Sequence, residues 1–368
     1  MMPRKIGIFL PNWIGDVAMA TPALRAIHRK FGGTAELVAI QRPYVAAVLE
    51  GNPWISRSIS YDPKTWFTEQ GYWPLLQSLW REKFDSLVLF PNSLVSGALA
   101  WLAGAPQRAG FARDWRGWLL SDPIAPSAEP RPLVDEYLEI AYRLGCPEES
   151  KRLELHTTPA DEAAADYYWG ELELPANGGE VVLLNGGGGW GGKASAKAWP
   201  VENFAALARK IVDESAAHVL VNCGPKEREQ AAAIVSLADH PRVVSLAPLR
   251  PEELTLGLTK ASIRRSRLVV TTDSGPRHIA TAFDKPVVTL FGPTDPRDTE
   301  TYHPRAIHLY DKFECAPCWE QHCPLGHHAC MRGLSVERVY AAVAAVMTRW
   351  ERTPILDSFA VMPTRSAA

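Results

Sequence analysis

The stretch Leu268–Pro296 constrains the fold more than any other part of the chain. Its sequence, LVVTTDSGPRHIATAFDKPVVTLFGPTDP, changes from strand to helix and back to strand. Leu268–Thr271 is a short β-branched run, which is typical of a buried parallel strand. The helix carries His278–Ala282 and ends before Pro286, because proline cannot continue it. Val287–Phe291 follows as a second buried strand. This unit predicts an α/β protein built on a parallel sheet.

The start of this helix is a candidate anion site. Asp273, Ser274 and Gly275 are residue types that cap helices. A helix N-terminus directly after a strand offers backbone N–H groups and a partial positive charge, so it binds anions. Arg277 adds a fixed charge, and His278 adds a ring donor one turn further on. A capped helix in any α/β domain is the simpler interpretation. The G-P-T-D-P sequence after the next strand favours a phosphate site.

Composition excludes several classes of protein. A length of 368 residues predicts two domains, and a net charge of −2 gives no reason to expect nucleic-acid binding. The start, MMPRKIGIFLPNW, leads directly into a strand, so we expect no cleavable signal peptide. The longest apolar stretch, near Leu94–Ala105, is too short to span a bilayer. Four of six cysteines lie within Cys315–Cys330, unlike a secreted disulfide framework. We therefore expect a cytoplasmic protein.

The N-terminal part predicts a βαβ unit with a carboxylate at its ligand-binding end. Lys5–Leu10 and Glu36–Ile40 are expected strands, and Val17–Lys30 is an expected helix between them. Such units bind ligands at the carboxyl ends of their strands, which is where Asp16 lies. Asp16 is thus a candidate general base. The alternative is a carboxylate that only interacts favourably with the helix dipole.

A second α/β alternation follows a polar, glycine-bearing sequence at Leu174–Glu180. We expect the domains to span residues 1–176 and 177–350, with a C-terminal tail at 351–368. Alternating strands and helices of this length predict a doubly wound parallel sheet. The expected strands of this half are Val181–Leu184, His218–Cys223 and Val243–Leu246, and the expected helices are Val201–Val212, Lys226–Leu237, Pro251–Lys260 and Ser335–Arg349.

The glycine-rich stretch Leu184–Pro200 matches neither the nicotinamide fingerprint nor the P-loop, in which Lys193 would precede Ser or Thr. What remains is a loop with two lysines. Lys197 is the better candidate for a site, because A-W-P anchors it to a helix start. Asn185, at the end of the preceding strand, and Glu227, a possible ribose or adenine contact, complete the predicted substrate-binding residues.

Two further segments each allow two interpretations. The stretch from Arg42 to Trp118 is rich in tryptophan and arginine, which suits either internal packing or the rim of a binding surface for an anionic, partly lipidic partner. Its members are Trp54, Trp66, Trp73, Trp80, Trp101, Trp115, Trp118, Arg42, Arg81, Arg108, Arg113 and Arg116. The cysteines Cys315, Cys318, Cys323 and Cys330 suit either structural zinc or metal-free thiols that pack a long loop.

Several motifs together resemble glycosyltransferase family 9, the bacterial lipopolysaccharide heptosyltransferases. They are N-W-I-G-D-V-A-M-A-T-P-A-L-R-A, K-A-W-P, D-S-G-P-R-H-I-A and G-P-T-D-P, in this order across nearly the whole chain. The cysteine-rich sequence from Cys315 to Met331 is similar to the heptosyltransferase II subgroup. At Pro276 and Arg277 the family more often has apolar residues.

The resemblance implies a GT-B fold, with an acceptor-binding first domain and a donor-binding second domain, both Rossmann-like. It implies an inverting transfer, without metal or other cofactor, of heptose from ADP-L-glycero-D-manno-heptose to the heptose of the lipopolysaccharide inner core. The partners would be ADP-heptose and a lipid A-core acceptor at the inner face of the inner membrane. By position, Asp16 matches the base, Lys197 the donor-phosphate lysine, and Asp273, Ser274, Gly275 and His278 the donor site. A GT-B-like nucleotide-sugar epimerase, a transferase with another sugar donor, and a zinc-stabilised interaction protein are the alternatives.

Overall fold

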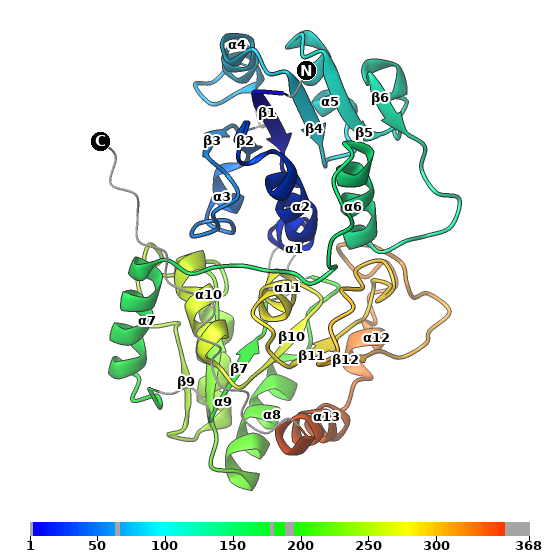
Figure 1. The fold of residues 1–368 in the computed structure, drawn as a ribbon. Coiled ribbons are helices and arrows are strands. Elements are labelled where there is room, and N and C mark those ends of the chain that lie inside the picture. The colour runs from blue at the N-terminus through cyan, green and yellow to red at the C-terminus, as the bar shows by residue number, and fades with distance from the viewer. Residues whose placement is uncertain (1–2, 63–66, 177–179, 188–194, 350–368) are drawn as a thin grey trace. The chain divides into compact units, whose positions relative to one another are not determined.

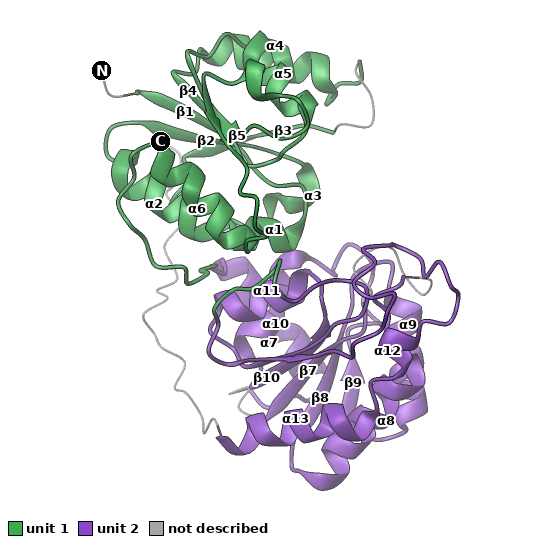
Figure 2. Cartoon of the chain, turned by 90° about the vertical axis from the view of Figure 1, so that its right-hand side faces the viewer, with its two compact units in different colours: residues 1–155, 297–302 green, residues 156–296, 303–368 purple. Residues whose placement is uncertain are grey.

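The computed structural model describes residues 3–62, 67–176, 180–187 and 195–349. The chain divides into two compact units (Figure 2). Unit 1 contains residues 1–155 and 297–302, and unit 2 contains residues 156–296 and 303–368. Figure 1 shows in each unit a central sheet flanked by helices. The predicted C-terminal tail, 351–368, lies outside the described residues.

Unit 1 is built on a six-stranded parallel sheet of order β3-β2-β1-β4-β5-β6. Its strands are β1 (Lys5–Phe9), β2 (Glu36–Gln41), β3 (Arg57–Ser60), β4 (Ser86–Leu89), β5 (Gln107–Phe111) and β6 (Asp122–Ile124). Its helices are α1 (Ile14–Met19), α2 (Thr21–Phe31), α3 (Pro43–Ala46), α4 (Tyr72–Glu82), α5 (Leu94–Leu102), the 3₁₀ helix η1 (Gly117–Leu119) and α6 (Leu133–Arg143).

The helices of unit 1 cover both faces of its sheet. In Figure 2, α4 and α5 lie on one face, and α2 and α6 lie on the other. Leu75 and Leu79 of α4 and Leu99 of α5 pack with Phe9 and Leu87 in one buried cluster. Burial of these apolar side chains, at about 25 cal/mol per Å², holds the two helices on the sheet.

Unit 2 repeats this architecture with a second six-stranded parallel sheet, of order β12-β11-β10-β7-β8-β9. Its strands are β7 (Val181–Asn185), β8 (His218–Asn222), β9 (Val243–Ser245), β10 (Leu268–Thr272), β11 (Val287–Leu290) and β12 (Ala306–Leu309). Its helices are α7 (Pro159–Glu171), α8 (Val201–Glu214), α9 (Arg228–Ala238), α10 (Leu256–Arg265), α11 (Gly275–Ala282), α12 (Ala329–Arg332) and α13 (Val336–Arg349).

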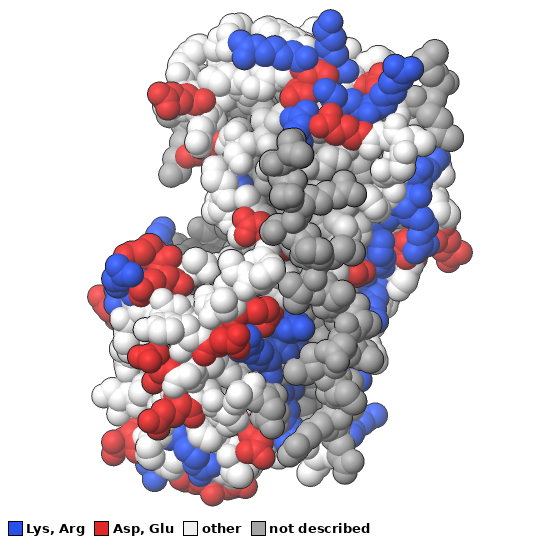
Figure 3. Space-filling model, turned by 60° about the vertical axis from the view of Figure 1, so that its left-hand side comes forward, with Lys and Arg blue, Asp and Glu red and all other residues white. Residues whose placement is uncertain are grey.

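Both sheets have the strand order of a Rossmann-like fold, because in each the first strand lies between the second and the fourth. The predicted α/β class with two doubly wound parallel sheets is confirmed. Charged side chains of both signs are interspersed on the face drawn in Figure 3. Near β1 and α4, for example, Lys5 and Arg57 pair with Glu36 and Glu82.

Some elements differ from the sequence prediction. The helix expected at Val17–Lys30 is two helices that meet at Ala20, because Pro22 has no N–H to donate back to Ala18. The Thr21 hydroxyl donates to that carbonyl oxygen instead, at 2.6 Å. The helix expected from Pro251 begins only after Thr255, whose hydroxyl accepts from the Leu258 N–H and caps it.

The division between the units falls after Leu155, earlier than the expected break at residue 176. The reason is α7, which the sequence analysis did not predict and which packs on α10 of unit 2. A capping box starts α7: the Thr158 side chain accepts from the Asp161 N–H, and the Asp161 carboxylate accepts from the Thr158 N–H.

Candidate active site

The carboxyl ends of β7 and β10 form the centre of the candidate site in unit 2. The sheet order reverses between these neighbouring strands, and open α/β sheets bind ligands at such a switch point. The Thr272 hydroxyl at the end of β10 donates a hydrogen bond of 2.9 Å to the Gly187 carbonyl oxygen in the loop after β7. This bond connects the ends of the two strands. The rest of the glycine-rich loop, residues 188–194 with Lys193, lies outside the described residues.

Asp273 is the hub of a buried polar network that begins where β10 ends. Its carboxylate oxygen Oδ2 accepts from the Lys197 ammonium group at 2.9 Å and from the Thr294 hydroxyl at 2.8 Å. Its other oxygen, Oδ1, lies 3.2 Å from Nη1 of Arg277. All four side chains are buried. Two cations against one carboxylate leave an excess of positive charge among these groups, which favours an anionic ligand.

The charge state of Asp273 follows from its neighbours. Burial alone would raise the pKa of this carboxyl, but the positive charges of Lys197 and Arg277 outweigh it and hold the pKa well below its usual value. Asp273 is therefore ionised at neutral pH. A carboxylate in this state fixes the Lys197 side chain in place, where an unpaired buried ammonium group would be costly.

The sequence analysis expects the charge of Arg277 to face an anion, but in the structure this side chain points into the protein. Its guanidinium group is fully buried and lies over the Phe291 ring, with 4.8 Å between Cζ and the ring centroid. Nη2 lies 3.2 Å from Nε2 of His308. The guanidinium group thus faces Asp273 and the β11–β12 side of the sheet. Thr294, Phe291 and His308 were not predicted as site residues, although the G-P-T-D-P motif contained the threonine.

His278 lies one turn into α11 and is 3% exposed. Within the described part of the chain, its Nδ1 has no hydrogen-bond partner. Burial, and then the charge of Arg277, lower the pKa of His278 from 6.5 to about 3. The ring is therefore neutral at neutral pH and can donate one hydrogen bond to a ligand and accept another. A buried polar atom without a partner is costly, and a bound ligand would relieve that cost.

Ser274 and Gly275 begin α11, as predicted, and Pro276 occupies its first turn. However, the Ser274 hydroxyl does not cap the helix. It donates to the Thr272 carbonyl oxygen at 3.3 Å and lies 3.2 Å from the Thr271 hydroxyl. Because that side chain turns back to β10, the Gly275 N–H at the start of α11 has no side-chain cap among the residues that the structure describes. This arrangement suits an anion at the helix N-terminus.

Asn185 and Glu227 lie at the same end of the unit 2 sheet. Asn185 accepts a hydrogen bond of 2.9 Å from Asn222, at the ends of β7 and β8. The Glu227 carboxylate accepts from the Gly224 N–H at 3.0 Å. A Cβ atom on Gly187 would lie 2.0 Å from Oε1 of Glu227, so any other residue there would require this carboxylate to move. The loop after β7 therefore passes directly beside this carboxylate.

Asp16 lies in unit 1, in the first turn of α1, and is half-buried. It follows β1, which pairs with β4 at the switch point of the unit 1 sheet. Burial, and then the negative charge of Asp16, raise the pKa of the Tyr137 phenol on α6. The structure thus places Asp16 at the expected strand end. The other candidate residues lie in unit 2.

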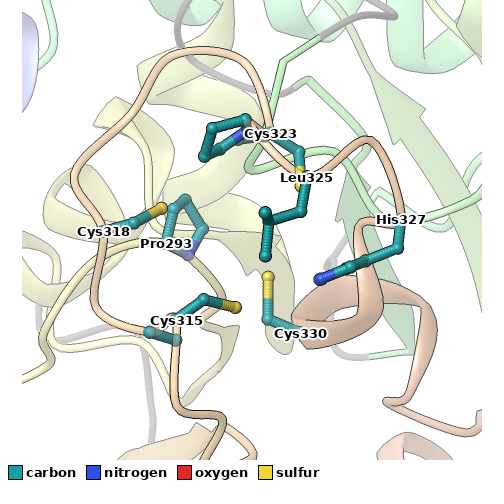
Figure 4. Close-up of a pocket in the computed structure, with 10 residues that line it drawn as sticks. Pro293, Cys315, Cys318, Cys323, Leu325, His327 and Cys330 are labelled. Carbon is teal, nitrogen blue, oxygen red and sulfur yellow. The ribbon is translucent and has the colours of Figure 1, made fainter.

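The four clustered cysteines, Cys315, Cys318, Cys323 and Cys330, line one pocket together with Leu325 and His327 (Figure 4). All four are free thiols. Backbone hydrogen bonds, the strongest from His328, lower the pKa of Cys323. Nowhere in the described ranges are three or more His, Cys, Asp or Glu side chains placed to hold one metal ion. Metal analysis decides between zinc and free thiols.

The cysteine-bearing loop contacts the two segments that supply Lys197 and Thr294. The Trp319 N–H donates to the Pro293 carbonyl oxygen at 2.8 Å. The Ala196 N–H donates to the Gln321 carbonyl oxygen, also at 2.8 Å. Both bonds lie one residue from a partner of Asp273. The loop therefore supports the polar network from outside.

The chain is similar to known glycosyltransferases over nearly its whole length. The model of glycosyltransferase family 9 (heptosyltransferase) matches residues 72–329. Lipopolysaccharide heptosyltransferase 2 of Escherichia coli K12 is 25% identical over 359 residues, which cover 94% of this chain and 99% of that protein. Lipooligosaccharide heptosyltransferase 2 of Campylobacter jejuni is 26% identical over 351 residues, with the same coverage.

Solved structures show the same fold. The chain matches E. coli ADP-heptose lipopolysaccharide heptosyltransferase II with a TM-score of 0.76 and 22% identity, over 94% of this chain and 99% of that one. A family 9 glycosyltransferase from Veillonella parvula gives a TM-score of 0.78 at 21% identity, over 94% and 98%. Because the family model spans more than half of the sequence, the chain belongs to glycosyltransferase family 9, the heptosyltransferase family.

Proposed function

We propose that this chain transfers heptose from ADP-L-glycero-D-manno-heptose to the heptose of the lipopolysaccharide inner core, as a heptosyltransferase II-like enzyme. The observation that carries the proposal is the buried Lys197–Asp273–Arg277 network beside the uncapped start of α11. It offers positive charge to a diphosphate at the switch point of a Rossmann-like unit. Relatives named lipopolysaccharide heptosyltransferase 2, similar over nearly their whole length, support the sugar and the acceptor class.

In this proposal the protein's own groups stabilise the leaving diphosphate, and no metal ion or other cofactor takes part. Lys197 and the first N–H groups of α11, at Ser274 and Gly275, would contact the phosphates. His278 would donate or accept one hydrogen bond as a neutral ring. Such preorganised donors act on charge that develops as the sugar–phosphate bond breaks. Arg277, which is fully buried, would hold Asp273 rather than touch the donor.

Asp16 is proposed as the general base. A hydroxyl of the acceptor attacks the anomeric carbon from the side opposite ADP, and its proton passes to the Asp16 carboxylate. The bond from the anomeric carbon to the phosphate oxygen breaks, and ADP leaves, so the anomeric configuration inverts. Asn185, at the end of β7, and Glu227, at the start of α9 beside Gly187, are proposed to border the nucleoside.

Among the described residues, no helix is long and apolar enough to cross a bilayer. We propose a cytoplasmic enzyme that works at the inner face of the inner membrane, because its acceptor is anchored there by lipid A.

The test is a panel of nucleotide-heptoses with truncated core acceptors, followed by mass spectrometry and NMR of the product. The proposal expects ADP-L-glycero-D-manno-heptose and a heptose-bearing acceptor to give a product with one added heptose and inverted linkage. Epimerised or hydrolysed sugar nucleotide, formed equally well without acceptor, would instead identify a nucleotide-sugar epimerase.

A further inference from the structure

One side of unit 1 exposes large apolar side chains to water. They come from α4, α5 and η1, and α4 and α5 cover the same side of the unit 1 sheet (Figure 2). Each is between 43% and 71% exposed. We call this surface the tryptophan face, which consists of Trp73, Trp80, Leu94, Trp101, Leu102 and Trp118. Trp54 of the same tryptophan-rich stretch is buried, whereas these tryptophans are exposed.

The tryptophan face is continuous. The Trp73 and Trp80 rings meet edge to face, with 5.7 Å between centroids. The Trp80 indole N–H donates to the Leu102 carbonyl oxygen at 2.7 Å, which links α4 to α5. Trp101 and Trp118 meet at 6.3 Å, which links α5 to η1. A contiguous apolar patch of this kind on a soluble protein is a mark of an interaction site.

The helix α5 is apolar on both sides. Its sequence, LVSGALAWL, contains no charged residue. Leu99 and Ala100 face the core, whereas Leu94 and Trp101, two turns apart on the helix, face outward. A surface helix normally turns charged or polar side chains to water, so the outer side of α5 is suited to a partner.

A neighbouring loop holds another tryptophan out in solvent. Trp115 is 93% exposed, and both it and Asp114 have left-handed backbone conformations, with φ of 61° and 52°. The next residue, Arg116, is fully buried and donates to the Phe111 carbonyl oxygen and the Ser96 hydroxyl, both at 2.9 Å. Backbone strain of this kind persists where the surroundings fix it, and the hydrogen bonds of Arg116 anchor the loop directly after Trp115.

Two basic residues lie at the end of α4, the helix that supplies Trp73 and Trp80. Arg81 and Lys83 are exposed at the end of α4. The carboxylate between them, Glu82, already pairs with Lys5 at 2.9 Å and Arg57 at 2.6 Å. Positive charge next to exposed indoles complements a negatively charged lipid surface, which attracts Lys and Arg side chains.

We propose that the tryptophan face docks the enzyme on an anionic lipid bilayer. Indole rings have an apolar body and a polar N–H, and they settle at the level of the lipid headgroups. The face would bring unit 1 to the membrane that carries the acceptor. The inference rests on the proposed function in this one respect: a lipid-anchored acceptor requires work at a bilayer surface.

The test uses the full chain and vesicles without acceptor, of phosphatidylcholine alone or with phosphatidylglycerol. The double variant Trp101→Gln/Trp118→Gln should bind the mixed vesicles at least about tenfold more weakly, since each ring buries apolar surface. Tyr167→Gln, at a residue that is 62% exposed on α7 of unit 2, is the matched control and should bind normally. Unchanged ADP affinity in both variants establishes that they fold.

A second double variant tests the contribution of the two basic residues at the end of α4. Arg81→Gln/Lys83→Gln should bind the anionic vesicles only about as well as phosphatidylcholine alone and lose much of the salt dependence, with little change on phosphatidylcholine. Equal vesicle binding by wild type and the tryptophan variant would overturn the proposal. So would a wild-type dimer in sedimentation that the tryptophan variant abolishes, because the face would then join two copies of this chain.

Turnover with a soluble, delipidated core acceptor separates the two proposals. Heptose transfer by a wild-type enzyme that ignores vesicles would overturn the docking surface and leave the proposed function standing. Vesicle binding through the tryptophan face, without any heptose transfer, would support the surface and overturn the proposed function.

Discussion

The Lys197 ammonium group contacts Asp273 twice, at 2.9 Å from the carboxylate oxygen Oδ2 and at 2.9 Å from the backbone carbonyl oxygen. These two bonds tie the loop before α8 to the start of α11, across a separation of 76 residues in the chain. A buried ammonium group held in this way is preorganised for an anion, because little side-chain freedom remains to be lost on binding.

Replacing Lys197 by alanine should weaken ADP binding about tenfold to a hundredfold, since charge-assisted hydrogen bonds contribute about 1.5–3 kcal/mol. Isothermal titration calorimetry measures the affinity, and the melting temperature reports any loss of stability. Lys210→Ala is the matched control, because Lys210 forms an exposed pair with Glu214 on α8. If both variants bind ADP like wild type, the donor site lies elsewhere.

The pH dependence of the unfolding free energy should show the lowered pKa of His278 in the folded chain. Because its pKa falls from 6.5 to about 3 on folding, the unfolded chain binds more protons below pH 6.5. Its contribution to stability is therefore fully present above pH 6.5 and is lost as the pH falls toward 3. The slope is up to about 1.4 kcal/mol per pH unit.

Urea unfolding of wild type and His278→Gln between pH 4.5 and 7.5 measures this effect. The difference in unfolding free energy between the two proteins should change with pH over this range. Asp273 does not interfere, because its lowered pKa affects stability only near and below its ordinary value of 3.8. A constant difference from pH 4.5 to 7.5 would show that His278 is protonated as readily in the folded chain.

Turnover should survive EDTA nearly intact, because cations and N–H groups of the protein are proposed to surround the diphosphate. A steady-state assay with and without chelator checks this expectation. Activity that disappears with EDTA and returns with Mg²⁺ or Mn²⁺ would contradict the proposed donor site.

The four cysteines of the Cys315–Cys330 loop are expected to remain metal-free thiols. Elemental analysis of the purified protein, with thiol titration, measures this directly. One zinc ion per chain would contradict the expectation, and EDTA should then lower the melting temperature, because metal binding contributes to folding.

The sequence predicted those parts of the fold that depend on local pattern. The β10–α11–β11 unit follows from the apolar run before Asp273 and from Pro286. The helix α7 was missed although Thr158 and Asp161 form a capping box, because the proline-bearing sequence around them resembles a linker. Its assignment to unit 2 depends on packing against α10, which lies far away in the sequence.

The candidate site was likewise predictable only in part. Lys197 and Asp273 were predicted separately, and the structure brings them together. The direction of Arg277 could not be predicted, because it depends on contacts with Phe291 and His308, two residues distant in the sequence that follow β11 and lie on β12. The Ser274 hydroxyl was expected to cap α11 but bonds to β10, since a serine at a helix start can reach either backbone.

The most direct test of the proposed transfer is the turnover of Asp16→Asn with ADP-heptose and a core acceptor. Asparagine keeps the size and polarity of the side chain but cannot take the acceptor proton. A positioned base contributes about 10²–10⁴-fold, so turnover should fall by that factor while ADP affinity and melting temperature stay near wild type. If Asp16 only interacts favourably with the dipole of α1, its replacement should affect stability slightly and leave turnover near normal, and near-normal turnover of Asp16→Asn would therefore contradict the account.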